Sequence, residues 1–147
     1  MYRHILVATD GSKLSSRAVV HAIGLARALG AKLTAFYASP DYPLPAYAEG
    51  VVYEPVSPRE YERLCNKEAE KIFKQVEVKA AASQVKLATV HSISSAPWEA
   101  ILGAAKKNKA DAIVMASHGR TGVSALLLGS ETQKVLTHSR VPVIVIR

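Results

Sequence analysis

Residues 112–133 read AIVMASHGRTGVSALLLGSETQ, and this stretch decides the fold class. The run 113–115 is apolar throughout, which is typical of a strand covered on both faces of a parallel sheet. The sequence then turns abruptly polar at residues 117–120. Ser130 is followed three residues later by Gln133, a spacing that predicts a capping box and therefore a helix that begins at Ser130.

The polar loop and the start of this helix form a candidate phosphate site. The first amides of a helix lack partners within it, and the helix dipole places partial positive charge beside them. Gly129 comes directly before the expected helix. A strand, a glycine loop and a helix in this order therefore predict an anion cradle made mostly of backbone amides.

The rest of the chain alternates between strand-like and helix-like patterns. Apolar residues at spacings of three and four predict a helix over 15–29, with Gly30 at its C-cap. The whole sequence predicts strands at 3–8, 32–38, 84–92, 111–116 and 141–147 and helices at 15–29, 58–82, 98–107 and 130–139. Five strands separated by helices predict one domain over residues 1–147, an α/β fold with three layers and a doubly wound parallel sheet.

Residues 39–57 interrupt this alternation. They contain four prolines and three tyrosines and show no helix or strand pattern. An irregular segment of this length is unusual in a compact domain and is typical of a lid or a binding loop. Because the tyrosines can pack, we favour a mobile flap over a plain spacer.

Composition excludes several classes of protein. With 147 residues, 49% of them hydrophobic, the chain can bury the core of one ordinary domain. The single cysteine, Cys65, cannot form an internal disulfide, which suits a reducing compartment. No apolar run has the length of a signal-peptide core or a membrane span, so we expect a soluble cytoplasmic protein that does not bind membranes.

The positive charge raises the question of nucleic acid binding. The net charge is +7 and the isoelectric point is near 9.6. The basic residues are dispersed among acids and helix ends, and no helix-turn-helix, zinc-finger or aromatic ribonucleoprotein pattern accompanies them. We therefore favour a solvated basic surface over a nucleic acid site, for which binding would depend steeply on salt.

Common catalytic and metal motifs are missing from the sequence. The glycine loop lacks the Gly-Lys-[Ser/Thr] ending of a P-loop, and Gly122 to Leu126 lacks the second glycine of a nucleophile elbow around Ser124. The histidines show no paired ligand spacing. We expect no metal site, no catalytic residue and at most slow, incidental ATP hydrolysis.

Four segments resemble the universal stress protein family. They are Ala116-x2-Gly119-x9-Gly129-Ser130, where the family usually has G-x2-G-x9-G-[ST], together with residues 3–12, 110–115 and 140–146. Ala116 stands at the place of the first glycine. The resemblance spans almost the whole chain and implies a Rossmann-like, adenine nucleotide alpha hydrolase-like fold with strand order 3-2-1-4-5.

The same resemblance implies an adenine nucleotide site where the strand order reverses. The ligand would be ATP, with Mg²⁺, or another adenine nucleotide. Asp10 would accept hydrogen bonds from ribose, the backbone near Ala38 and Met115 would meet adenine, and the loop and helix start would surround the phosphates. The predicted binding residues are Thr9, Asp10, Ala38, Met115, Ala116, His118, Gly119, Arg120, Gly129, Ser130, Glu131 and Thr132.

The expected role is a regulatory or sensing module in the stress response. Ala116 adds a methyl group where backbone and ligand approach, and it disfavours a positive φ. Glu131 would repel phosphate if it faced the site, although Arg120 could offset its charge. The alternative is a dimeric interaction protein that has lost ATP binding. Asp10 has an alternative too, as a turn residue that orders Gly11 and Ser12.

The last predicted strand carries an apolar edge. Val143 to Ile146 are all apolar, and such an edge should not remain unpaired in a soluble protein. In the family this strand often meets its twin across a two-fold axis. We therefore expect a homodimer through Val143 to Ile146, while the protein partners stay unknown.

Overall fold

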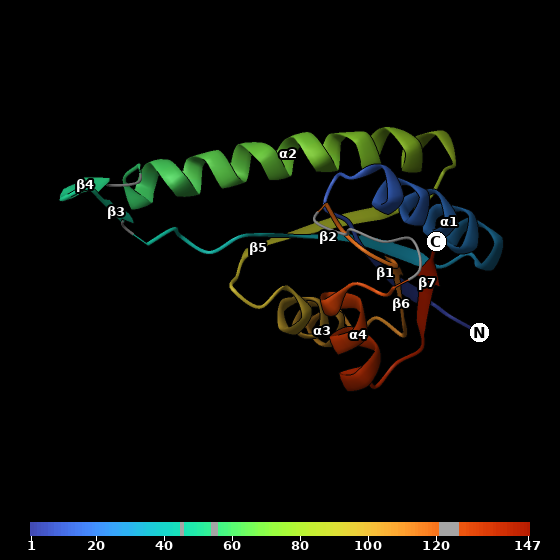
Figure 1. Ribbon diagram of the computed structural model, residues 1–147. Helices are drawn as coiled ribbons and strands as arrows, with labels where there is room; N and C mark the ends of the chain where they lie inside the picture. Colours follow the sequence, from blue (N-terminus) through green and yellow to red (C-terminus); the bar gives the residue numbers. More distant parts are fainter. Residues whose placement is uncertain (45, 54–55, 121–126) are drawn as a thin grey trace.

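The apolar run at residues 113–115 is the centre of a buried strand, as predicted. A computed structural model describes residues 1–44, 46–53, 56–120 and 127–147 of the chain (Figure 1). The strand β6 (Ala112–Ala116) is buried along its whole length and pairs in parallel with β1 (His4–Ala8). These two strands form the middle of the main sheet.

Three further strands complete this sheet. β2 (Lys32–Ser39) and β5 (Leu87–Ile93) lie beyond β1, β7 (Val143–Ile146) lies beyond β6, and every neighbouring pair is parallel. The order β5-β2-β1-β6-β7 is the predicted order 3-2-1-4-5 when the strands of this sheet are counted along the chain. The order reverses between β1 and β6, so a ligand site is expected at the carboxyl ends of these strands.

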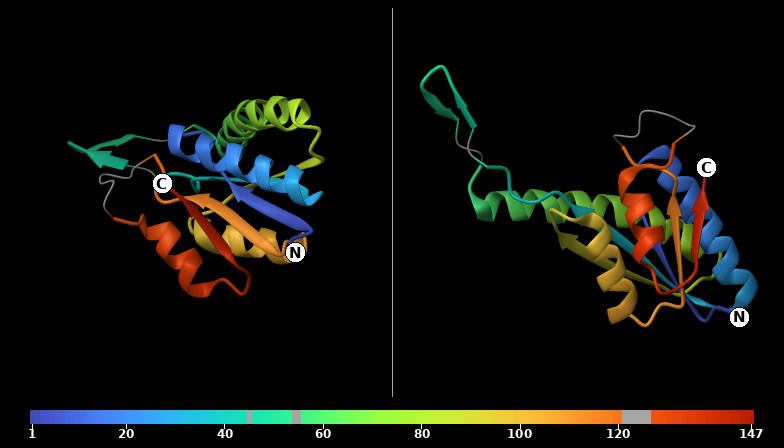
Figure 2. Two further views of the ribbon diagram at one scale, coloured as in Figure 1. Left: turned by 90° about the vertical axis from the view of Figure 1, so that its right-hand side faces the viewer. Right: turned by 60° about the horizontal axis from the view of Figure 1, so that its bottom comes forward.

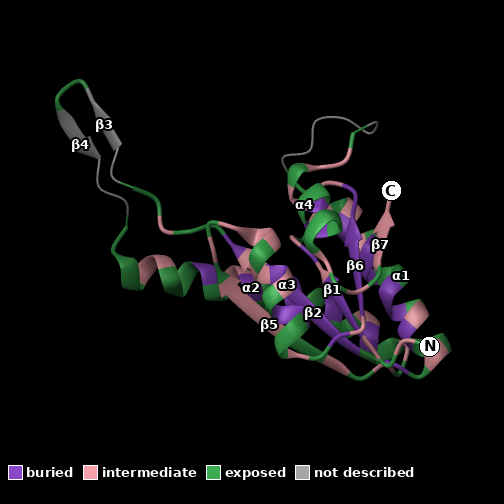
Figure 3. Ribbon diagram, turned by 90° about the horizontal axis from the view of Figure 1, so that it is seen from below, coloured by how far each residue is buried: buried purple, intermediate pink, exposed green. Residues whose placement is uncertain are grey.

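Helices cover both faces of the sheet (Figures 1 and 2). α1 (Lys13–Leu29) and α2 (Pro58–Ala82) lie on one face, and α3 (Pro97–Lys107) and α4 (Ser130–His138) lie on the other. Successive residues of a strand point to opposite faces, so Val114 packs in the core under α1 and α2 and Ile113 in the core under α3 and α4. Figure 3 shows the buried residues concentrated in β1, β2 and β6.

Serine side chains begin α1 and α2. The Ser12 hydroxyl oxygen accepts a hydrogen bond from the Ser15 amide at 3.2 Å, so α1 starts two residues earlier than predicted. Gly30 ends this helix as predicted, with a φ of 63°. Ser57 caps α2 in the same way, and α2 has the predicted bounds.

The capping box predicted for α4 is wrong. The helix begins at Ser130, but its N-cap is Gly129, and no side chain caps it. The Gln133 side chain instead donates to the carbonyl oxygen of Leu128 at 2.8 Å. A β-carbon at Gly129 would lie 3.1 Å from the Cα of His118, so the close approach of two backbone segments determines the residue at this cap.

The segment 39–57 contains regular structure that the sequence analysis missed. β3 (Ala46–Ala48) and β4 (Val51–Tyr53) form an antiparallel hairpin, joined by a turn in which Glu49 and Gly50 both have positive φ. This is the φ pattern of the tight turns that suit hairpins. Figure 2 shows the hairpin standing away from the sheet beyond the start of α2. The predicted flap includes residues 45, 54 and 55, which lie outside the described residues, and its mobility stays a prediction.

α2 is the longest helix, with 25 residues. Cys65, Ile72 and Val76 on this helix are buried, whereas Leu64 is 43% exposed. Within the described ranges, neither α2 nor any shorter helix combines the length and apolar character needed to cross a membrane.

Replacing Leu6 by Ala should lower the free energy of unfolding by roughly 2 to 5 kcal/mol, because Leu6 is 0% exposed and its removal leaves a cavity under α3 and α4. The matched control is Leu64→Ala, which should cost less than about 1 kcal/mol. Urea unfolding followed by circular dichroism measures both. Equal losses would contradict the assignment of the core.

Candidate functional site

A cavity of about 570 Å³ opens at the carboxyl ends of β1, β2 and β6, where the strand order reverses. This volume is typical of sites for small organic ligands. All twelve residues of the predicted binding set line the cavity. The sequence analysis missed seven other lining residues, namely Ala8, Ser15, Phe36, Tyr37, Pro40, Pro97 and Ile101.

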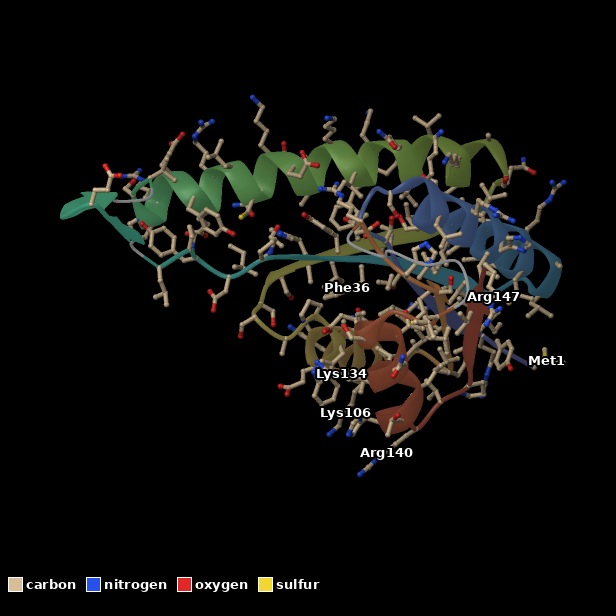
Figure 4. All side chains as sticks on the ribbon, in the orientation of Figure 1. Met1, Phe36, Lys106, Lys134, Arg140 and Arg147 are labelled. Carbon is tan, nitrogen blue, oxygen red and sulfur yellow. The ribbon has the colours of Figure 1, made fainter. Side chains whose placement is uncertain are left out.

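Part of the cavity lining is apolar. Phe36 from β2, Met115 from β6 and Ile101 from α3 are all buried in the same core cluster and line the cavity. Figure 4 shows Phe36 on the side of β2 that faces α3. These residues look like ordinary core positions in the sequence, and only the packing of α3 against the sheet brings them to one cavity. Apolar side chains of this kind suit contact with a flat, apolar ring.

Asp10 is an acidic residue of the cavity lining. Its Oδ1 accepts a hydrogen bond from the Ser12 amide and its Oδ2 accepts one from the Arg120 amide, both at 2.9 Å. Burial raises the pKa of this carboxyl, but hydrogen bonds from Ser12, Ser15 and Arg120 outweigh it and hold the pKa below its ordinary value. Asp10 is therefore the turn residue considered in the sequence analysis, and it also ties the glycine loop to β1. Its role toward ribose stays a prediction.

Two glycines allow the loop to fold closely on itself. A β-carbon at Gly119 would lie 2.7 Å from Oδ2 of Asp10, so a larger residue would displace the carboxylate. The Gly129 amide donates to the carbonyl oxygen of Ser117 at 2.7 Å. Both glycines lie where two groups approach closely, so neither position has room for a side chain.

Ala116 does not need the backbone freedom of glycine. It is the last residue of β6, pairs with Ile146 of β7 and does not have a positive φ. Ala116 is also buried in the core cluster under α1 and α2, on the opposite face from Met115. The expected conflict with a positive φ therefore does not arise at this position.

Glu131 contacts α3, and the expectation that Arg120 offsets its charge is wrong. Oε2 of Glu131 accepts a hydrogen bond from the Trp98 amide at 2.9 Å, in the first turn of α3, which has no side-chain cap of its own. Oε1 lies 3.4 Å from Nζ of Lys134. Arg120 does not offset this charge, because its guanidinium pairs with Glu68 of α2 at 3.2 Å.

Hydroxyl groups hold the strand ends and helix starts together around the cavity. Thr132 donates to the carbonyl oxygen of Ala116 at 3.0 Å and so fixes α4 to the end of β6. The hydroxyls of Thr9 and Ser15 lie 3.1 Å apart and join β1 to α1. His118 lines the cavity beside the buried Ser117, with its Nδ1 3.1 Å from the Ser117 hydroxyl. Ser130 lines it from the start of α4.

The described part of the chain contains no group of three His, Cys, Asp or Glu side chains that could hold a metal ion. Exposed basic residues such as Lys106, Lys134 and Arg140 lie on the α3 and α4 side, outside the cavity lining (Figure 4). The residues of the rejected nucleophile elbow, 122–126, lie outside the described ranges.

Comparison with known proteins places this architecture among its relatives. The sequence model of the Universal stress protein family matches residues 1–147. A Thermus aquaticus protein named "Universal stress protein in QAH/OAS sulfhydrylase 3'region" is 36% identical, over 100% of both chains. The structure of universal stress protein UspA from Lactobacillus plantarum has a TM-score of 0.82 at 28% identity and covers 99% of this chain and 98% of its own. A universal stress protein solved in complex with cAMP has a TM-score of 0.71 at 26% identity, over 99% and 97%.

Asp10→Asn should make stability less dependent on pH. Folding lowers the pKa of Asp10, so the ionised carboxylate adds to the free energy of unfolding. This added stability is fully present above the unfolded-state pKa and is lost as the pH falls through the folded-state pKa. We expect the variant to be less stable by about 1 kcal/mol at neutral pH, and the difference to shrink below about pH 4. Urea unfolding from about pH 7 to about pH 3 measures it, with exposed Asp41→Asn as the control. If the stability difference between the wild type and Asp10→Asn stayed constant down to about pH 3, the ionised carboxylate of Asp10 would not be the stabilising group.

Proposed function

The chain belongs to the universal stress protein family, and from this premise we propose that its cavity binds an adenine nucleotide and that this binding serves regulation or sensing in the stress response. Within this class we propose ATP, which would bring Mg²⁺ on its phosphates. The universal stress protein solved with cAMP, at 26% identity, supports an adenine nucleotide as the ligand class.

The observation that carries the proposal is that one cavity combines three kinds of lining group. Phe36, Ile101 and Met115 are apolar, Asp10 is a carboxylate whose Oδ2 accepts from the Arg120 amide of the glycine loop, and Gly129 and Ser130 lie at the start of α4. A base, a sugar and phosphates need these three kinds of partner. The cavity of about 570 Å³ is large enough for such a ligand.

Each part of the ligand would meet a different kind of group. Adenine would lie against the apolar side chains and the backbone near Ala38 and Met115. A carboxylate has about four acceptor positions, so Asp10 retains capacity for ribose hydroxyls after accepting from Ser12 and Arg120. The phosphates would meet backbone amides at Gly119 and in the first turn of α4, where the helix dipole favours negative charge.

Native mass spectrometry with added Mg²⁺ and ATP tests the proposal. We expect one nucleotide mass per chain for the wild type and none for Ala38→Phe, because Ala38 lines the cavity, is only half-buried, and a phenyl ring there would take up space that the ligand needs. The matched control is Ala81→Phe, on the exposed face of α2, which should bind like the wild type.

The rival interpretation predicts a different result. If ATP, ADP and AMP all leave the wild type bare at millimolar concentration while Ala116→Gly binds them, this chain is a nucleotide-independent interaction protein. If neither the wild type nor Ala116→Gly bound a nucleotide, the proposal would also be overturned. Equal binding to the wild type and to Ala116→Gly would support it, since Ala116 already has an extended backbone.

We also propose a homodimer through β7. Among the residues that the structure describes, this strand is at the edge of the main sheet, pairs only with β6, and leaves all four of its residues partly exposed. Pairing with the β7 of a second copy would cover this apolar edge.

Ile144→Lys should convert the dimer to a monomer, because it places a charge in the apolar edge. Multi-angle light scattering after size exclusion measures the molar mass. The control is Val78→Lys, at a 61% exposed position of α2, which should leave the mass unchanged. A wild type that already has the mass of one chain would disprove the dimer.

A further inference from the structure

Arg120 is held in two directions at the mouth of the cavity. Its backbone amide donates to Oδ2 of Asp10 at 2.9 Å. Its guanidinium lies on the α2 side, with Nη2 3.2 Å from Oε1 of Glu68. The same nitrogen lies 3.1 Å from the position that a β-carbon on Gly11 would take. The side chain that could neutralise phosphate is therefore turned toward α2.

The charges around the cavity make this orientation important. Among the described lining residues, Asp10 and Glu131 are acidic and Arg120 is the one lysine or arginine. Residues 121–126, which follow Arg120 in the sequence, are Thr-Gly-Val-Ser-Ala-Leu and have no charged side chain. Lys134 lies beside Glu131, at 3.4 Å, and is not a lining residue. A polyphosphate chain in this cavity would depend on Arg120 for a cationic side chain.

We propose that Glu68 determines how many phosphates the site accepts, by competing with the phosphate chain for Arg120. The inference rests on the proposed function, because it concerns the same adenine nucleotide cavity. Glu68 does not line the cavity, so it acts through Arg120 as a positioning residue. A single phosphate can be held by the amides of the loop and of α4. Further phosphates gain from Arg120, whose planar guanidinium matches their geometry, only when it leaves Glu68.

The exposure of the ion pair makes this exchange possible. The side chains of Arg120 and Glu68 are 52% and 40% exposed, so water screens their attraction. Ion pairs of this kind contribute little to stability, and Arg120 can leave Glu68 at small cost. The expected effects on affinity are therefore changes of a few fold, and they should increase with the number of phosphates.

The test compares the affinities of AMP, ADP and ATP by isothermal titration calorimetry. Glu68→Gln should tighten ATP binding by between about 1.5-fold and about 5-fold and change AMP binding much less, with ADP between them. The matched control is Glu70→Gln, which removes the same charge from the same helix. Residue 70 is exposed and points away from residue 68, since two helical positions differ by about 200°. The ratio of its affinity for ATP to its affinity for AMP (the ATP to AMP ratio) should equal that of the wild type.

A double-mutant cycle separates this role from a structural one. Arg120→Gln should weaken ATP binding, and Glu68→Gln should then have no further effect on the ATP to AMP ratio. Glu68→Asp should keep a ratio near that of the wild type. A ratio unchanged in Glu68→Gln, or changed equally in Glu70→Gln, would overturn this inference and leave nucleotide binding intact. Absence of AMP, ADP and ATP binding in every variant would overturn the proposed function and this inference together.

Discussion

The parallel pairing of β1 with β6 is the constraint on which the rest of the structure depends. After β1 the chain crosses to α1 on one face, and after β6 it continues to α4 on the other. Right-handed crossovers on opposite faces leave the carboxyl ends of these two strands uncovered, so a crevice forms there before any particular residue is considered. The buried apolar residues of both strands fix this geometry. The polar residues that follow them lie at the crevice because the strands end there.

The polar groups around the crevice are used mainly to hold the structure together. Asp10 binds two backbone amides, Glu131 caps a neighbouring helix, and Thr132 fastens α4 to β6. Each contact satisfies a group that would be costly to leave without a hydrogen bond. These side chains therefore shape the cavity by fixing the strand ends and helix starts around it, whatever further contact they make with a ligand.

Local pattern predicted the bounds of α2. The strand order and the twelve residues that share the cavity were implied by the family resemblance, which covers nearly the whole chain. The sequence did not predict contacts made over long separations, such as Glu131 with Trp98, 33 residues apart, or Arg120 with Glu68, 52 residues apart. Phe36 and Ile101 were missed because a core residue and a cavity-lining residue have the same local pattern. The capping box failed because a steric limit at Gly129 took precedence over a favourable side-chain spacing.

Ala116 shows why a missing motif residue must be judged in its structural setting. A glycine in a loop motif indicates either a positive φ or a close approach, and these two requirements have different consequences. At Gly119 the requirement is close approach, since a β-carbon would meet the Asp10 carboxylate at 2.7 Å. At Ala116 neither requirement is evident, because the residue continues a strand and is buried in the core under α1 and α2. The positions of the motif therefore differ in what they require: Gly119 excludes a β-carbon beside Asp10, whereas position 116 carries one at the end of β6.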